Sequence, residues 1–256
     1  MTTIRDVRIL ADASVIAQTA AAEFLDAARE SIREKNSFNI ALAGGSTPKA
    51  LYELLSSNPL LQARVPWSKV QFFFGDERHV RPDDPESNYR MAAEAMFSKA
   101  PVDARQVHRI QAEKTDAAEA AEKYEGELQA FFRLEPGQLP RFDLVLLGMG
   151  PEGHTASLFP GTKALNEQKR LVVSNWVGKL YTDRITLTPP VLNAAARVIF
   201  MVHGAEKAPA LKAVLEGPHE PDQLPAQIVQ PQNGKVLWLV DPTAASMLIP
   251  KAKRAV

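Results

Sequence analysis

One histidine in this sequence stands in a glycine-rich stretch directly after an apolar run. Residues 142–147 read FDLVLL, and the chain continues through Gly148-Met149-Gly150 to His154. The apolar run is too short for a helix and predicts a buried parallel strand that ends in a tight turn. Open α/β sheets bind ligands at the carboxyl ends of their strands, and an imidazole exchanges a proton near neutral pH. His154 is therefore a candidate catalytic residue, with a purely structural histidine as the alternative.

The same stretch has the spacing of a nucleotide-binding motif. The three glycines within 148–153 satisfy G-x-G-x-x-G, the fingerprint of a dinucleotide-binding turn. That motif opens a long helix, but Pro160-Gly161 would end any helix begun near Thr155 after little more than a turn. The motif also requires an acidic residue about 20 positions further on, where this sequence has residues 172–175, VVSN. A nicotinamide site is thus disfavoured, and no cofactor is expected.

A second glycine-rich turn follows the apolar run 38–43 and reads Gly44-Gly45-Ser46-Thr47-Pro48. Thr47 is expected to cap a helix that continues to about Leu55, and Pro48 suits the first helical position. The two glycines let a ligand come close to the backbone, and the free N–H groups of a helix start attract an anion. The segment lacks the spacing of a Walker A loop. An anion site and an ordinary strand-to-helix turn both fit these residues.

Charged residues follow two further predicted strands. Asp76-Glu77-Arg78 comes directly after the apolar run 70–74. Three charges in that place fit the rim of a cleft better than a core, and a loop held by salt bridges is the alternative. Lys207 falls in the first turn of a helix after the strand 198–202, where its charge opposes the helix dipole unless an anion lies nearby.

The apolar pattern alternates strands with helices along the whole chain. Strands are expected at residues 7–10, 38–43, 70–74, 107–110, 142–147, 171–175, 184–188, 198–202 and 236–240. Helices are expected at residues 14–34, 48–55, 87–99, 115–134, 190–196 and 207–215, with another after Asp241. This alternation predicts an α/β fold with a mostly parallel, doubly wound sheet and helices on both faces. No linker divides the sequence, so residues 1–256 are expected to form a single domain.

Composition narrows the choice of partners. The chain has 30 basic and 30 acidic residues, so no overall charge attracts nucleic acid or an anionic membrane, and any anion must be held by local groups. The absence of cysteine excludes disulfides, a thiolate nucleophile and cysteine-bound metals. The first residues, MTTIRDVRIL, contain no apolar signal core, and no run is long enough to span a bilayer. We expect a cytoplasmic protein, as a monomer or a weak dimer, without nucleic-acid or membrane partners.

Six blocks of this sequence, taken in order, resemble the 6-phosphogluconolactonases, and the resemblance covers nearly the whole chain. The blocks are LAGGSTPKALYELL (42–55), FFFGDERHV (72–80), DDPESNY (83–89), GMGPEGHTASLFPG (148–161), RITLTPPVLNAA (184–195) and HGAEKAPAL (203–211). That family is related to the glucosamine-6-phosphate deaminases, so the resemblance implies their Rossmann-like (NagB/RpiA-like) sheet and a hexose-6-phosphate site. The implied reaction is hydrolysis of 6-phospho-D-glucono-1,5-lactone to 6-phosphogluconate, a step of the oxidative pentose phosphate pathway.

The resemblance also implies roles for individual residues. His154 would be a general base that activates water, a role typically worth about 10² to 10⁴ in rate. Its imidazole would be oriented by a carboxylate of Glu152, Asp76 or Glu77. The phosphorylated sugar would be held by donors and cations: Gly44, Gly45, Ser46, Thr47, Arg78, Arg184 and Lys207. No metal is required. Glu152 departs from the family, which most often has the shorter aspartate at this place.

Three other interpretations remain open. Amino-sugar phosphate deaminase-isomerases carry Asp-Glu-Tyr where this chain has Asp76-Glu77-Arg78, and Asn-Glu-Pro after the Gly-His turn where it has residues 157–160, SLFP. A sugar-phosphate-binding regulator would keep the pocket without the turnover. A metal site is disfavoured because the recognised ligand spacings are absent; its ligands would be Asp76, Glu77, His79, Glu152 and His154.

Overall fold

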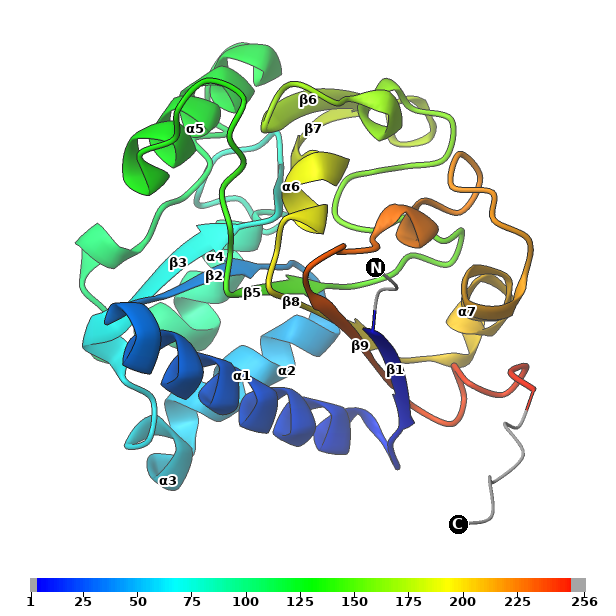
Figure 1. Cartoon of the computed structure of the whole chain (residues 1–256), viewed down its shortest axis with the longest axis horizontal. Coiled ribbons are helices and arrows are strands. Elements are labelled where there is room, and N and C mark those ends of the chain that lie inside the picture. The colour runs from blue at the N-terminus through cyan, green and yellow to red at the C-terminus, as the bar shows by residue number, and fades with distance from the viewer. Residues whose placement is uncertain (1–3, 250–256) are drawn as a thin grey trace.

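A parallel sheet of six strands runs through the centre of the protein (Figure 1). The structure is a computed structural model, and it describes residues 4–249. The strands, in spatial order, are β1 (Ile4–Ile9), β9 (Lys235–Val240), β8 (Arg197–Val202), β5 (Leu144–Leu147), β2 (Phe38–Leu42) and β3 (Val70–Phe74). Each neighbouring pair in this sheet is parallel. The α/β class and the parallel sheet expected from the sequence are confirmed.

Three further strands form a separate antiparallel sheet, which sequence reasoning did not predict. Its order is β4 (Asp76–Arg78), β7 (Thr182–Leu187) and β6 (Val172–Val177). The strands expected at 171–175 and 184–188 exist, but they pair with each other and not with the main sheet. Residues 178–181, which join β6 to β7, are enough for a hairpin and too few for a parallel crossover.

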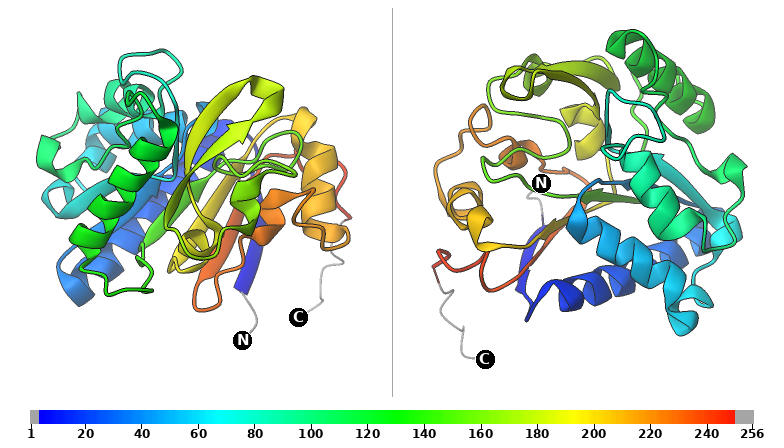
Figure 2. Two further views of the ribbon diagram at one scale, coloured as in Figure 1. Left: turned by 90° about the horizontal axis from the view of Figure 1, so that it is seen from above. Right: turned by 180° about the vertical axis from the view of Figure 1, so that it is seen from behind.

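Helices cover both faces of the main sheet (Figures 1 and 2). On one face, α1 (Ala13–Lys35) and α2 (Ser46–Ser57) pack against each other. The opposite side carries α6 (Pro189–Asn193), α7 (Ala208–Glu216) and the antiparallel sheet, on which α5 (Ala117–Phe132) packs. Two short helices, α3 (Pro59–Gln62) and α4 (Asn88–Ala92), follow α2 and β4 along the chain. This arrangement confirms the doubly wound fold.

Two predicted elements differ from those observed. Residues 107–110 contribute one isolated bridge to Phe72 instead of a strand. Residues 242–247 form turns instead of a helix, and residues 250–256 lie outside the described part of the chain. The carboxylate of Asp241 accepts hydrogen bonds from two backbone N–H groups of the 242–247 segment. These bonds cap a single turn, after which the backbone hydrogen bonds span only three residues, as from Ser246 to Thr243, so no α-helix continues.

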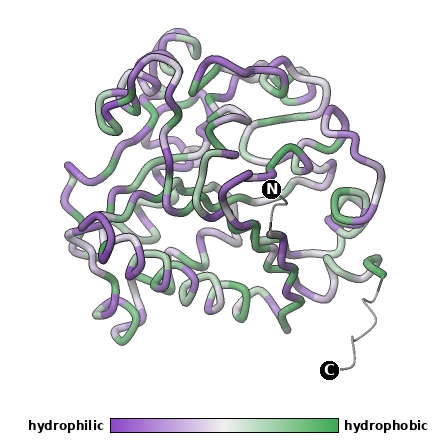
Figure 3. Tube along the Cα trace, in the orientation of Figure 1, coloured by the Kyte–Doolittle hydropathy of each residue, from purple (hydrophilic) through white to green (hydrophobic). Residues whose placement is uncertain are grey.

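The strands form the hydrophobic core because both faces of the main sheet are covered. All residues of β2 and β5 are buried, as expected for a parallel sheet between two layers. Hydrophobic and hydrophilic residues alternate along α1 (Figure 3), and its buried Phe24 packs edge-on against Phe38 of β2. Among residues 4–249, no helix has both the length and the apolar content needed to cross a membrane.

The strand order creates a switch point between β2 and β5, which are neighbours in the main sheet. From β2 the chain moves to β3 on one side, whereas from β5 it moves to β8 and β9 on the other. The loops that leave the carboxyl ends of β2 and β5 therefore diverge. Open α/β sheets bind their ligands in the crevice that such divergence leaves.

Candidate active site

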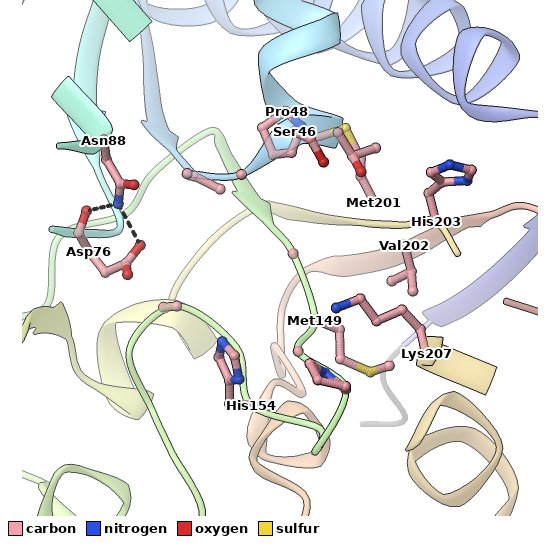
Figure 4. A pocket seen from close by; sticks show the side chains of 18 of the residues that line it. Ser46, Pro48, Asp76, Asn88, Met149, His154, Met201, Val202, His203 and Lys207 are labelled. Atoms are coloured by element: carbon pink, nitrogen blue, oxygen red, sulfur yellow. Dashed lines mark hydrogen bonds between the residues drawn. The ribbon is translucent and has the colours of Figure 1, made fainter. Parts of the chain in front are cut away.

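A cavity of about 280 Å³ opens at the carboxyl ends of β2, β5 and β8 (Figure 4). Three loops supply most of its wall, and three side chains from β4 and α4 complete it. The loops lie within residues 43–48, 148–156 and 201–207, and the added residues are Asp76, Arg78 and Asn88. Residues drawn from separate sequence motifs thus share one cavity, at the switch point of the sheet.

His154 is presented by a tight turn after β5. The backbone N–H of Gly150 donates to the carbonyl oxygen of His154 (2.9 Å), and the hydroxyl of Thr155 donates to the carbonyl oxygen of Gly148 (2.9 Å). Gly153 has φ 84°, a left-handed conformation that favours glycine. Gly150 is needed for another reason, because a Cβ atom there would lie 2.0 Å from Nδ1 of His154. Gly153 therefore shapes the turn, and Gly150 makes room for the imidazole.

The imidazole of His154 lies between Glu152 and Phe159. Its Nδ1 is 3.0 Å from Oε2 of Glu152, and its ring stacks on that of Phe159 with 4.1 Å between the centroids. Nδ1 and Oε2 are both buried, and neither is aligned for a hydrogen bond with any described residue, so a small rotation would join them. Because Nδ1 is turned to Glu152, Nε2 is the nitrogen left to exchange a proton in the cavity.

Burial keeps the imidazole of His154 neutral. It lowers the pKa of His154 from 6.5 to about 4. The carboxylate of Asp76 opposes this shift, whereas three nearby cations add to it: Lys207, Arg184 and Arg78. At neutral pH the ring is uncharged, which is the protonation state that a general base requires.

Asp76 is the carboxylate of the predicted Asp76-Glu77 pair that faces the cavity. It is buried, and its Oδ2 accepts a hydrogen bond of 2.6 Å from the hydroxyl of Ser157. The side-chain amide of Asn88 donates to the backbone carbonyl of Asp76 (2.9 Å; Figure 4). Asn88 also comes so close to the backbone that a Cβ atom at Gly44 would lie 1.9 Å from its Oδ1. Gly44 is therefore required by packing, whether or not a ligand is bound.

Glu77 does not line the cavity. It is buried, and its carboxylate oxygens accept hydrogen bonds from the Ser87 hydroxyl and from the backbone N–H groups of Arg78, Asn88 and Tyr89. Burial raises its pKa despite these bonds. The expectation that Glu77 can orient His154 is not met, because its acceptor positions hold the start of α4 beside β4. Within residues 4–249, no group of three or more His, Asp or Glu side chains is placed to hold a metal ion.

The start of α2 and Lys207 give the cavity a positive end. Helix α2 begins at Ser46, and its N-cap is Gly45 with φ 99°, so Thr47 lies inside the helix and is not its cap. No acidic residue stands in the first turn of α2. Lys207 reaches into the same cavity (Figure 4) from the short turn Ala205–Lys207, directly before α7 and not in its first turn as expected. Its ion pair with Glu206 is long, at 3.8 Å. A helix start beside a weakly paired ammonium group favours an anion such as phosphate.

Arg78 and Arg184 lie directly opposite each other on β4 and β7. Arg78 lines the cavity and contacts the backbone and the carboxylate of Glu86. Arg184 is not part of the cavity wall, and its buried Nε has no hydrogen-bond partner among the described residues. Burial and the charge of Arg78 lower the pKa of Arg184. Like charges at paired positions repel each other, so an anion beside this pair would be stabilised.

Sequence reasoning missed three polar residues of the cavity wall: Asn88, His203 and Glu206. His203 follows β8 directly, and its Nδ1 lies 3.3 Å from the buried carboxylate of Asp241, which follows β9. Its position after a buried strand, the same feature that marked His154, was the signal that would have identified it.

The chain matches the family model of glucosamine-6-phosphate isomerases and 6-phosphogluconolactonases over residues 11–238. It is 44% identical over 218 residues to a protein from Nostoc sp. that is named 6-phosphogluconolactonase. That match covers 85% of this chain and 87% of the relative.

Two solved structures share the fold over nearly their whole length. The crystal structure of devB protein superposes with a TM-score of 0.87 at 34% identity, over 96% of this chain and 100% of that one. The 6-phosphogluconolactonase from Trypanosoma cruzi superposes with a TM-score of 0.84 at 30% identity, over 97% of this chain and 98% of that one. The likeness therefore extends to both sheets and is not confined to the loops of the cavity.

Proposed function

The chain belongs to the glucosamine-6-phosphate isomerase/6-phosphogluconolactonase family, and we propose that it hydrolyses 6-phospho-D-glucono-1,5-lactone to 6-phosphogluconate. The observation that carries this proposal is one cavity that contains both a neutral imidazole, from His154, and a positive end made by α2 and Lys207. A lactone is an ester with an electrophilic carbonyl carbon. Its hydrolysis therefore needs chiefly a base for water and a firm hold on the phosphate.

In this proposal His154 is the general base. Its Nε2 takes a proton from water while the water oxygen adds to the lactone carbonyl carbon. When the bond from that carbon to the ring oxygen breaks, the imidazolium returns the proton to the ring oxygen. The Glu152 carboxylate, 3.0 Å from Nδ1, favours the tautomer with a proton on Nδ1 and stabilises the imidazolium. The route is metal-free.

The phosphate binds at the positive end of the cavity. Residues 44–47 offer backbone and hydroxyl donors, and hydrogen bonds to a charged group contribute roughly 1.5–3 kcal/mol each. Lys207 supplies a full positive charge, and Arg78 binds the sugar acid from the side of β4. The positive charge of Arg184, on the neighbouring strand β7, adds to that of Arg78.

A glucosamine-6-phosphate deaminase/isomerase is the second candidate, because the family model covers glucosamine-6-phosphate isomerases as well as 6-phosphogluconolactonases. The residues of this chain favour the lactonase. Ser157 is buried and donates its hydroxyl to Asp76, and residues 157–160 contain no acid that could open an amino-sugar ring. Arg78 also replaces the tyrosine expected in a deaminase.

The test is the rate of acid release from freshly prepared 6-phosphogluconolactone with and without the protein, corrected for spontaneous opening. Ammonia release from glucosamine 6-phosphate is measured in parallel. We expect accelerated acid release and no ammonia. Ammonia release would instead establish a deaminase. Saturable binding of 6-phosphogluconate without faster loss of the lactone would establish a sugar-phosphate-binding regulator.

A further inference from the structure

The tip of the β6–β7 hairpin lies against the turn that carries His154. The tip is a short turn at Gly178–Leu180, closed by Tyr181 in the left-handed region with φ 46°. The hairpin lies at the top of the molecule in the view of Figure 1, and its Trp176 and Tyr181 are exposed. Lys179 is the residue of this tip that makes polar contact with the turn.

Lys179 contacts both residues that flank the imidazole of His154. Its Nζ forms an ion pair with Oε1 of Glu152, and it lies over the ring of Phe159, 5.0 Å from the centroid. The other oxygen of the same carboxylate, Oε2, is the atom 3.0 Å from Nδ1 of His154. Phe159 is the ring on which the imidazole stacks. One ammonium group thus restrains both neighbours of the candidate base.

We propose that Lys179 is a positioning residue for His154, because it holds the carboxylate of Glu152 at Nδ1. The inference rests on the proposed role of His154 as the general base. A glutamate side chain is long and flexible, and an ion pair at Oε1 limits the positions that Oε2 can take. With Oε2 fixed at Nδ1, the tautomer that leaves Nε2 free for water is favoured.

The charge of Lys179 has a second effect on His154. An unpaired carboxylate beside Nδ1 would favour the imidazolium and raise the pKa of His154, and the ion pair with Lys179 offsets that charge. The other charged groups that face His154 are Asp76, Lys207, Arg184 and Arg78. A Lys179 variant leaves those four groups in place. A rise in the pKa of His154 in such a variant would therefore report the loss of the Lys179 charge, whereas a change of tautomer would report that Glu152 is no longer held at Nδ1.

The kinetic test is Lys179→Met, which keeps the aliphatic stem and removes the charge. By analogy with partners that orient metal-bound histidines, we expect kcat to fall about tenfold or more, while KM stays near the wild-type value. Lys179→Arg should recover most of the loss. Lys163→Met, at an exposed lysine of the segment Lys163–Asn166, is the matched control and should behave as wild type. A wild-type kcat in Lys179→Met would overturn the inference.

A second readout does not depend on turnover. Nitrogen NMR of protein with labelled histidine reports the tautomer and the pKa of His154. We expect the Nδ1–H tautomer in the wild type, and a mixture of tautomers with a raised pKa in Lys179→Met. Identical spectra in the two proteins would overturn the inference. The wild-type protein could also fail to accelerate lactone opening while Lys179→Met still shows the change of tautomer. That result would refute the proposed function, but Lys179 would still be shown to position the imidazole of His154.

Discussion

The chemistry of the site depends on the environment of one imidazole. His154 is held against Glu152 and Phe159, and its burial outweighs the favourable effect of the Asp76 carboxylate on the charged form. The ring therefore stays neutral at pH values where a solvated histidine would already be protonated. A low pKa makes a weaker base but keeps nearly every molecule in the active protonation state.

The pH dependence of the reaction follows from the direction of this shift. Only the neutral imidazole accepts a proton, so activity is lost as pH falls through the pKa of His154, which burial lowers from 6.5 to about 4. The substrate is a lactone without a phosphate group, and its kcat/KM is corrected for spontaneous opening. As the pH is lowered, this kcat/KM should still be at its maximum at pH 6.5 and should fall to half of that maximum near pH 4. A phosphate-free substrate is used because a phosphate group itself ionises near pH 6. Half-maximal activity near 6.5 would contradict the burial of His154.

At the residue scale, the sequence led to His154 and to Asp76, both of which line the cavity, but also to Glu77, which does not. Side chains along a strand alternate between its two faces. Asp76 and Arg78, two positions apart on β4, face the cavity, and Glu77 between them faces away. The sequence placed these residues at the rim of a cleft but did not predict a strand there, so it could not choose between the two carboxylates. Asn88 was missed because its place in the wall depends on a long-range contact with Asp76.

Two buried tyrosines fix the ends of the strands that carry the site. The hydroxyl of Tyr52 accepts from the backbone N–H of Ala43 (3.0 Å) and donates to its carbonyl oxygen (2.9 Å). The hydroxyl of Tyr124 makes the same pair of bonds with Phe74. Ala43 precedes the Gly44 turn, and Phe74 precedes the segment of Asp76. Both strand ends are thus anchored where the loops of the cavity begin.

We expect Tyr52→Phe to destabilise the protein by about 1–3 kcal/mol, because it leaves the buried N–H and carbonyl groups of Ala43 without their partner. Denaturant unfolding measures the free energy of unfolding directly. A loss of a few tenths of a kcal/mol would mean that water replaces the hydroxyl, and would contradict the anchoring role.

The turn after β5 is built closely around His154, and Gly150→Ala tests this. The new Cβ would lie 2.0 Å from Nδ1 of His154 and 2.6 Å from Oε2 of Glu152, so the imidazole must move. A misplacement of about 1 Å can cost about 10²-fold in rate, and we expect a loss of kcat of that order. Gly126→Ala on α5, where a Cβ meets nothing within 4 Å, is the control and should keep full activity. Wild-type kcat in Gly150→Ala would show that the turn is not tightly fitted.

At the scale of elements, periodicity in the sequence identified the strands of the main sheet but not which sheet each strand joins. The alternation in 171–175 and 184–188 fits either a parallel or an antiparallel pairing, and only the short link 178–181 distinguishes them. The start of α2 was predicted two residues late, because the capping preference of threonine was given more weight than the left-handed φ available to Gly45.

The whole molecule has no net charge to attract a phosphorylated substrate. Attraction must therefore come from local groups, and the cavity supplies them through the start of α2, Lys207 and Arg78. The first and last strands of the main sheet, β1 and β9, pair with each other. Because the sheet needs both ends of the chain, we propose that residues 1–256 form a single domain.

Lys207→Met should chiefly weaken the binding of the phosphorylated lactone. It removes the ammonium at the positive end of the cavity and leaves His154 in place, so we expect KM to rise at least about tenfold, equivalent to losing about 1.4 kcal/mol of binding free energy. A lactone without phosphate should be hydrolysed almost as before. Steady-state kinetics with both substrates make the comparison, and equal losses on both would contradict the phosphate assignment.

For the molecule as a whole, the sequence predicted the class of fold and the end of the sheet where the site lies. The alternation of strands and helices, together with glycines after 38–43 and 142–147, was sufficient for that prediction. The strand order was not predictable, because it depends on which buried edges pair across long stretches of chain. That order makes β2 and β5 neighbours and so brings residues 44–47 and His154 into one cavity.

The most direct test of this account is the hydrolysis of fresh 6-phosphogluconolactone by His154→Gln, compared with the wild type and corrected for spontaneous opening. Loss of the general base should lower kcat by about 10² to 10⁴, while the binding of 6-phosphogluconate and the thermal stability stay close to those of the wild type. His219 is exposed and does not line the cavity, so His219→Gln is the control and should leave kcat unchanged. Turnover by His154→Gln at the wild-type rate would contradict the central claim that His154 takes the proton from water.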